Sequence, residues 1–163
     1  MQFTQNILKS KMTKSSIENE LHTKGEIVYT NVGDSMYPLI RPEGDIIIIK
    51  KCNGNLKKYD IPLYKRTDGS YILHRVLNVK ADGSYIMCGD NRWRREKGIS
   101  DENILGILSC VVRDGKENYL SGFKYRLYVF FWCRMYYIRA IALIIKGMFV
   151  PKKRRSSKNA RNR

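Results

Sequence analysis

Two residues of this sequence, Ser35 and His74, are of the types that carry out nucleophilic catalysis. Ser35 follows an apolar-alternating segment and lies between Gly33, which tolerates unusual backbone angles, and Pro38, which fixes φ and lacks a donor. These neighbours predict a turn, and a turn on a rigid support can present a hydroxyl outward. Read alone, the run better fits an ordinary turn serine that bonds to the backbone. The assignment of Ser35 therefore depends on other residues.

A serine hydroxyl is a weak nucleophile until a positioned base removes its proton. His74 is one of two histidines, and it alternates in a predicted strand with Ile72 and Val76, so the three share a face. A structural core histidine is the alternative interpretation. Four lysines are further candidate bases, but their charged surroundings favour solvated side chains: Lys50, Lys57, Lys58 and Lys65.

A histidine base also needs an acid that sets its tautomer and stabilises the imidazolium. Three acids follow within reach: Asp90, Glu96 and Asp101. Glu96 lies in the charged run 92–97, so it could equally be one more solvated side chain. The residues alone leave the choice open.

Four short runs occur in a fixed order along the chain. They are Ser35-Met36-Tyr37-Pro38, Gly44-Asp45 before the apolar Ile46–Ile49, His74-Arg75-Val76, and Gly89-Asp90-Asn91. In this order they resemble the signal-peptidase-like serine peptidases, whose relatives include the LexA-type self-cleaving repressors. The resemblance covers about residues 25–113, and four ordered motifs are more specific than any one of them. It implies a peptidase that processes signal or leader peptides.

The resemblance also implies roles for individual residues. It puts the base at the start of the Arg-Val pair, which is His74 here, as in the histidine-using branch of the family. It gives Asp90 and Asn91 a supporting role, and we expect Met36 and Tyr37 to line the substrate site.

The histidine-using relatives carry an aspartate six residues after the Asp90 position, where this chain has Glu96. We therefore rank the acids Glu96, Asp101, Asp90. The backbone N–H of Ser35 should serve the oxyanion hole. Many relatives add a hydroxyl two residues before the nucleophile, where Gly33 stands here.

Short apolar segments separated by turn residues predict a mainly β fold. The expected strands are 26–32, 45–51, 61–66, 71–80, 84–88 and 104–112, after a short helix over 15–23. The continuous β-branched run 46–49 predicts burial on both faces. Together with the resemblance, this indicates a coiled, partly closed β-barrel-like sheet of the signal peptidase/LexA-type fold, with a C-terminal apolar helix. We divide the chain into 1–25, a peptidase-like domain 26–123, and 124–163.

The net charge of +16 is unevenly distributed. Twelve of the 31 basic residues lie after Phe123 and no acidic residue does, so subtracting them from +16 leaves +4 for residues 1–123. The segment 127–150 is apolar and aromatic but is interrupted by arginines, so we expect it to lie in a membrane interface, with spanning as the alternative. With the basic residues that follow, it predicts attachment to a membrane surface through residues 127–155, at the bacterial cytoplasmic membrane. The body 1–123 should then fold without the appendage.

The remaining composition argues against several other classes of protein. The four cysteines lack metal-ligand spacing and suggest buried free thiols, so we expect no metal and no cofactor. Nucleic acid is disfavoured as a partner because no helix-turn-helix is apparent, although the basic tail leaves it open. The alternative to a peptidase is a catalytically inactive or regulatory module of the same fold that binds membrane or nucleic acid.

Overall fold

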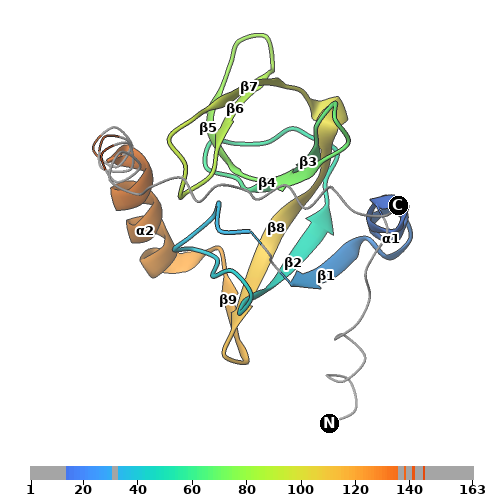
Figure 1. Cartoon of the computed structure of the whole chain (residues 1–163), viewed down its shortest axis with the longest axis horizontal. Coiled ribbons are helices and arrows are strands. Elements are labelled where there is room, and N and C mark those ends of the chain that lie inside the picture. Colours follow the sequence, from blue (N-terminus) through green and yellow to red (C-terminus); the bar gives the residue numbers. More distant parts are fainter. Residues whose placement is uncertain (1–13, 31–32, 136–137, 139–140, 142–144, 146–163) are drawn as a thin grey trace, which may run out of the picture.

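The computed structural model describes residues 14–30 and 33–135, together with residues 138, 141 and 145. The fold is mainly β, with a curled sheet and two helices (Figure 1). In chain order the elements are α1 (Lys14–Lys24), β1 (Glu26–Thr30), β2 (Ile46–Lys51), β3 (Pro62–Lys65), β4 (Tyr71–Leu73), β5 (Arg75–Val79), β6 (Tyr85–Cys88), β7 (Glu96–Ile99), a 3-10 turn (Asp101–Asn103), β8 (Ile104–Arg113), β9 (Lys116–Tyr119) and α2 (Gly122–Arg134).

The larger sheet is built around the long strand β8. Its strand order is β1-β2-β8-β3-β4, and β9 pairs with the end of β8 as a hairpin. Register shifts between Ile48 and Ile49 and between Leu63 and Tyr64 interrupt the pairing with β8. Such irregularities bend a strand and increase its twist, which fits the curled shape of this sheet.

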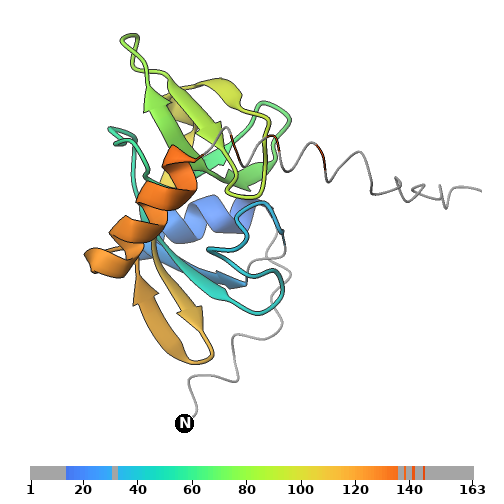
Figure 2. The same cartoon turned by 90° about the vertical axis from the view of Figure 1, so that its left-hand side faces the viewer.

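A smaller sheet of order β5-β6-β7 lies beside one end of the larger sheet (Figure 2). The chain passes from one sheet to the other at His74, because β4 pairs with β3 whereas β5 pairs with β6. The predicted single strand 71–80 is therefore wrong as one element, and His74 lies at the break between its two halves.

Two apolar clusters form the core. The first lies under α1 and the β1-β2-β8 region and includes Leu21, Ile27, Met36, Ile40 and Ile49. The second lies where the two sheets meet and includes Leu56, Tyr64, Val76, Tyr85 and Met87. The second cluster contains side chains from strands of both sheets. The junction that carries His74 is therefore a packed part of the core.

Most predicted elements are confirmed within a residue or two, including the N-terminal helix. The run 46–49 differs, because Ile47 and Ile49 are buried while Ile46 and Ile48 are only half-buried. The prediction of full burial on both faces is wrong, since this strand belongs to an antiparallel sheet with one better-covered face. Strands β7 and β9 were not expected. The four cysteines are free, and Cys52 is half-buried while the others are buried.

Helix α2 packs on the body through aromatic side chains. Tyr128 donates a hydrogen bond of 2.9 Å to the Asp90 carboxylate, and Trp132 donates one of 3.0 Å to the Asp90 carbonyl oxygen. Tyr125 accepts a hydrogen bond of 2.9 Å from Arg75. The expected boundary between residues 123 and 124 therefore falls inside a helix that contacts buried residues of the body.

The predicted membrane segment 127–150 is described only in part. Its beginning forms the second half of α2, and most of the rest lies outside the described residues. Among the residues that the structure describes, no helix has the length and apolar character needed to cross a membrane.

Candidate active site

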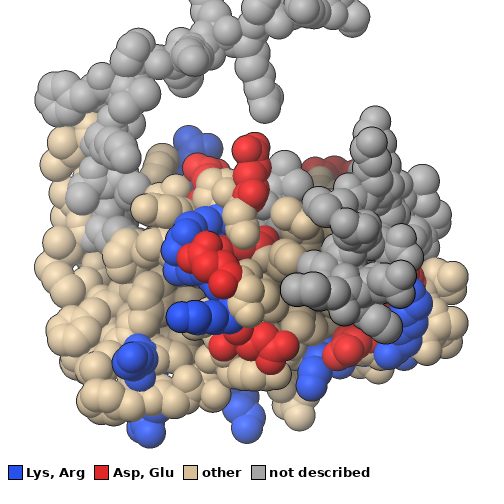
Figure 3. Space-filling model, turned by 90° about the horizontal axis from the view of Figure 1, so that it is seen from below, with Lys and Arg blue, Asp and Glu red and all other residues tan. Residues whose placement is uncertain are grey.

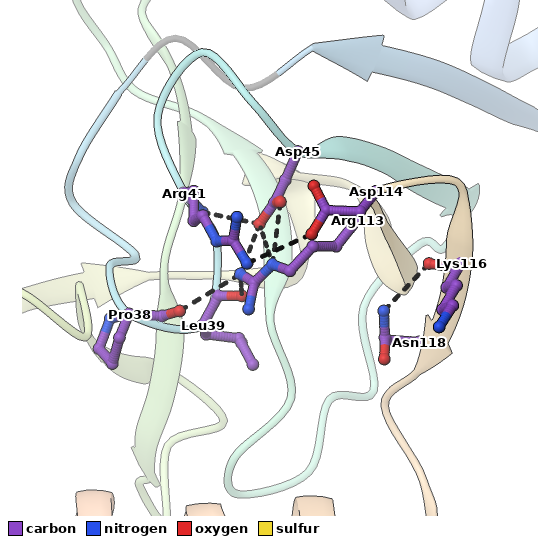
Figure 4. A network of polar contacts seen from close by, with 8 residues as sticks. All are labelled: Pro38, Leu39, Arg41, Asp45, Arg113, Asp114, Lys116 and Asn118. Atoms are coloured by element: carbon purple, nitrogen blue, oxygen red, sulfur yellow. Dashed lines mark hydrogen bonds and ion pairs between the residues drawn. The ribbon is translucent and has the colours of Figure 1, made fainter.

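Ser35 lies in the loop between β1 and β2, which is anchored at its far end by an ion pair between the buried Asp45 and the partly exposed Arg113. Asp45 is 1% exposed and accepts hydrogen bonds from Arg113 and from the backbone N–H of Arg41 (Figure 4). Arg113 also donates to the carbonyl oxygen of Leu39 at 2.9 Å. Burial tends to raise the pKa of Asp45, but the hydrogen bonds from Arg113 and Arg41 lower it overall. The carboxylate of the Gly-Asp run thus ties the Ser35 loop to the end of β8.

Residues 89–91 hold the other side of Ser35. The Asn91 backbone N–H donates to the Ser35 carbonyl oxygen at 2.8 Å. The Asn91 side chain donates to the Asp34 carbonyl oxygen at 3.2 Å. The Arg92 guanidinium pairs with the Asp34 carboxylate at 2.5 Å, and this hydrogen bond lowers the pKa of Asp34. Asn91 and Arg92 therefore hold the chain at Asp34 and Ser35.

Gly89 is the point at which Ser35 and His74 approach each other. A Cβ added there would lie 2.6 Å from the Ser35 carbonyl oxygen and 3.1 Å from Cδ2 of His74. Because any side chain would collide with one or both, glycine is what allows the two to come together. The Cδ2 edge of the imidazole and the Ser35 carbonyl oxygen therefore both border Gly89.

The opposite side of the imidazole faces an acid. Nδ1 of His74 lies 3.0 Å from Oε1 of Glu96 and 3.2 Å from the Tyr64 hydroxyl. A carboxylate at Nδ1 favours the tautomer with its proton on Nδ1, which leaves a lone pair on Nε2. His74 is 7% exposed, and this burial lowers its pKa, although the Glu96 charge partly offsets the effect. The imidazole is therefore neutral at neutral pH, as a general base must be.

Glu96 is itself held by two further side chains. Arg66 binds its carboxylate with both Nε, at 2.8 Å, and a terminal guanidinium nitrogen. Tyr64, which is fully buried, adds a hydrogen bond from its hydroxyl. Burial tends to raise the pKa of Glu96, but the hydrogen bonds from Arg66 and Tyr64 lower it overall, so the carboxylate stays charged.

The other two candidate acids have different partners. Asp101 accepts hydrogen bonds from the Tyr85 hydroxyl and from the Asn55 backbone at 3.1 Å. Asp90 forms a buried bidentate pair with Arg75 at 2.8 and 2.6 Å. Asp90 thus fixes residues 89–91 through its ion pair with Arg75. Glu96 is the acid that contacts His74.

The two residues predicted to line the substrate site differ in exposure. Met36 is 1% exposed and belongs to the apolar core, whereas Tyr37 is 49% exposed beside Ser35. Of the two, Tyr37 is the side chain that a peptide could contact directly.

Sequence reasoning did not identify Tyr64 or Arg66 as part of the site. They lie on and just after β3, whose pairing with β4 brings them next to His74. Neither belongs to the four ordered motifs, so only the strand pairing could have revealed them. In the described part of the chain, no group of histidine, cysteine and acidic side chains is arranged to hold a metal ion.

Comparisons of the chain with protein-family models, with curated proteins and with solved structures give no match. The chemical role of these residues therefore rests on their own geometry.

Proposed function

We propose that this protein is a serine endopeptidase in which Ser35 is the nucleophile, His74 the general base and Glu96 the acid that orients the base. One observation carries the proposal. The His74 ring has the Glu96 carboxylate 3.0 Å from Nδ1, while the Cδ2 edge of the ring and the Ser35 carbonyl oxygen both border Gly89. An acid, a histidine and a serine are the groups that nucleophilic catalysis by serine requires.

In the proposed reaction, Nε2 of His74 takes the Ser35 hydroxyl proton while Oγ attacks the carbonyl carbon of the scissile peptide bond. The carbonyl oxygen becomes an oxyanion, and the Ser35 backbone N–H is its expected donor. The imidazolium then gives its proton to the leaving amine, and the C–N bond breaks to leave an ester on Ser35. Water, activated by the same histidine, hydrolyses that ester and restores the hydroxyl.

The proposed substrates are signal peptides or the leaders of longer peptides, as the resemblance implies. Tyr37 is exposed next to Ser35 and would contact residues close to the cleaved bond. The competing function is a catalytically inactive or regulatory module of the same fold. Such a module would retain the Ser35 loop without an activated hydroxyl.

A serine-reactive fluorophosphonate probe and a peptide-cleavage assay test the proposal. We expect the probe to label Ser35, and labelling to be lost in His74→Ala. Ser35→Ala and His74→Ala should each lower turnover by at least about a thousandfold, and the double variant should be little worse because the groups act as a unit. Circular dichroism checks that each variant is folded. Full activity in His74→Ala would show that His74 is not the base and would favour a lysine instead. Absence of labelling and cleavage in the folded wild-type protein would favour the inactive module.

A further inference from the structure

The outer face of α2 is an exposed apolar surface on a helix whose inner face is already packed. We define the α2 outer face as four residues that are 74%, 40%, 55% and 57% exposed: Phe123, Leu127, Phe130 and Phe131. Their spacing of four, seven and eight residues from the first places them on one side of the helix. The aromatic side chains that bind Arg75 and Asp90 lie on the other side. The body therefore fixes α2 so that its apolar side points outward.

Exposed apolar residues continue beyond α2. Ile138, Ile141 and Ile145 are helical and are 63%, 58% and 49% exposed. Their spacing of three and four residues is again that of a single helix face. An exposed apolar surface of this extent is expected to contact something in the working protein.

The charges around the α2 outer face indicate what it contacts. Lys124 and Arg126 are exposed on α2 itself, and no acidic residue follows Glu117 in the sequence. Seen from below, the side on which α2 lies is largely free of acidic residues, which gather nearer the centre (Figure 3). Aromatic and aliphatic side chains bordered by lysine and arginine are the composition that binds an anionic lipid surface. The core of a protein–protein interface, by contrast, is depleted of lysine.

A cavity beside α2 favours lipid further. It has a volume of about 660 Å³ and lies between α2, β9 and the segment 58–61. Val129 and Phe130 contribute apolar lining, Lys58 and Arg126 contribute basic groups, and Asp60 contributes one acidic group. Phe130 belongs both to this lining and to the α2 outer face, so the two surfaces are continuous. A cavity of this size and lining suits an acyl chain beneath an anionic headgroup.

We infer that the α2 outer face docks this protein on the surface of an anionic lipid bilayer, with α2 lying along the interface and the β body held above it. This inference goes beyond the proposed peptidase activity and does not depend on it, because none of its residues belongs to the Ser35–His74–Glu96 group.

Sedimentation of the full-length chain with lipid vesicles tests the inference. One set of vesicles contains phosphatidylcholine alone, and the other contains equal parts of phosphatidylcholine and phosphatidylglycerol. The variant carries Phe123→Ser, Phe130→Ser and Phe131→Ser. The control carries Tyr29→Ser, which removes an aromatic side chain that is 36% exposed on β1, an edge strand on the side of the molecule away from α2 (Figure 1).

The wild-type chain should bind the anionic vesicles and bind phosphatidylcholine much more weakly. The triple variant should bind the anionic vesicles about a hundredfold more weakly, while Tyr29→Ser should bind like the wild type. Lys124→Gln with Arg126→Gln should reduce binding to anionic vesicles only, and added salt should have the same effect. Equal binding by wild type and triple variant, both shown by circular dichroism to be folded, would overturn the inference. So would light scattering that shows a dimer, abolished in the triple variant, without vesicle binding.

Discussion

Glu96 is the residue on which the geometry of the candidate site depends most. Its carboxylate is shared by His74, Arg66 and Tyr64, and it lies at the first position of β7. A glutamate is one methylene longer than the aspartate at the matching place in the histidine-using branch of the family that the sequence resembles. The additional hydrogen bonds from Arg66 and Tyr64 fix that longer side chain, so the Glu96 carboxylate stays oriented toward His74 despite the extra methylene.

Substitution of the candidate acids should separate their roles. Glu96→Gln should lower turnover more than Asp101→Asn, by about a hundredfold against less than about threefold, because Glu96 contacts His74 and Asp101 contacts Tyr85 and Asn55 instead. The measurement is turnover of one peptide by both variants, with Asp82→Asn, in an exposed turn, as a control. A larger loss in Asp101→Asn would exclude Glu96 as the acid.

The pH profile should report the pKa of His74. Burial lowers that pKa from its ordinary value of 6.5, and the Arg66 charge lowers it further. The acidic limb of kcat/KM should therefore lie below pH 6.5, and Arg66→Gln should move it to higher pH. Glu96→Gln should move it to lower pH, because the Glu96 charge raises the pKa of His74. A variant that only loosened the structure would lower the rate without moving the limb, so an unmoved limb in both variants would contradict this role of the pair.

The loop between β1 and β2 is stabilised by contacts with Arg113 at the end of β8. Asp45 accepts hydrogen bonds from Arg113, which also binds the carbonyl oxygen of Leu39, so one ion pair fixes the loop that carries the proposed nucleophile. Because Asp45 is buried, removing either partner leaves the other without its hydrogen bonds, which is the costly part of the change.

Asp45→Asn should lower the free energy of unfolding by about 1–3 kcal/mol at neutral pH. The pKa of Asp45 is lowered in the folded state, so its contribution is present above the ordinary value of 3.8 and is lost as pH falls below it. Urea unfolding of wild type and variant at neutral and acidic pH measures this. The difference between them should shrink in acid, and a constant difference would show that the carboxylate charge is not the cause.

The elements were largely predictable, whereas the partners of the site residues were predictable only in part. Alternation and turn residues revealed most strands of the larger sheet, because those signals are local. The strand 71–80 was not recognised as two strands, since nothing local in Leu73-His74-Arg75 shows that the chain changes sheets there. Tyr64 and Arg66 were missed for the same reason, because their proximity to His74 arises from strand pairing. Glu96 was ranked first among the acids on the resemblance, and the structure brings its carboxylate to His74.

Helix α2 packs against the body. Its aromatic side chains cover Arg75 and Asp90, which are 0% and 2% exposed, and Asp90 stands between Gly89 and Asn91 of the site. Sequence composition suggested a boundary after Phe123, because basic and aromatic residues accumulate there. The contacts of α2 instead favour a boundary after it.

Two truncated chains should distinguish these boundaries. A chain that ends at Met135 retains α2 and should unfold at nearly the temperature of the full chain. A chain that ends at Ser121 loses the hydrogen bonds of Tyr125, Tyr128 and Trp132 and exposes the Arg75–Asp90 pair, so it should unfold at a clearly lower temperature. Thermal unfolding followed by circular dichroism is the measurement. Equal melting temperatures for the two would make α2 an appendage.

The position of His74 between two sheets also bears on how the molecule reaches its native state. Ser35 comes from a loop of the first sheet, Glu96 from an edge strand of the second, and His74 from the junction, so their proximity requires contacts between distant parts of the chain. Contacts of this kind form late, after local hairpins such as β8–β9. During refolding, reactivity of Ser35 should therefore appear after most of the β-sheet signal, which makes the active hydroxyl a marker of the completed fold.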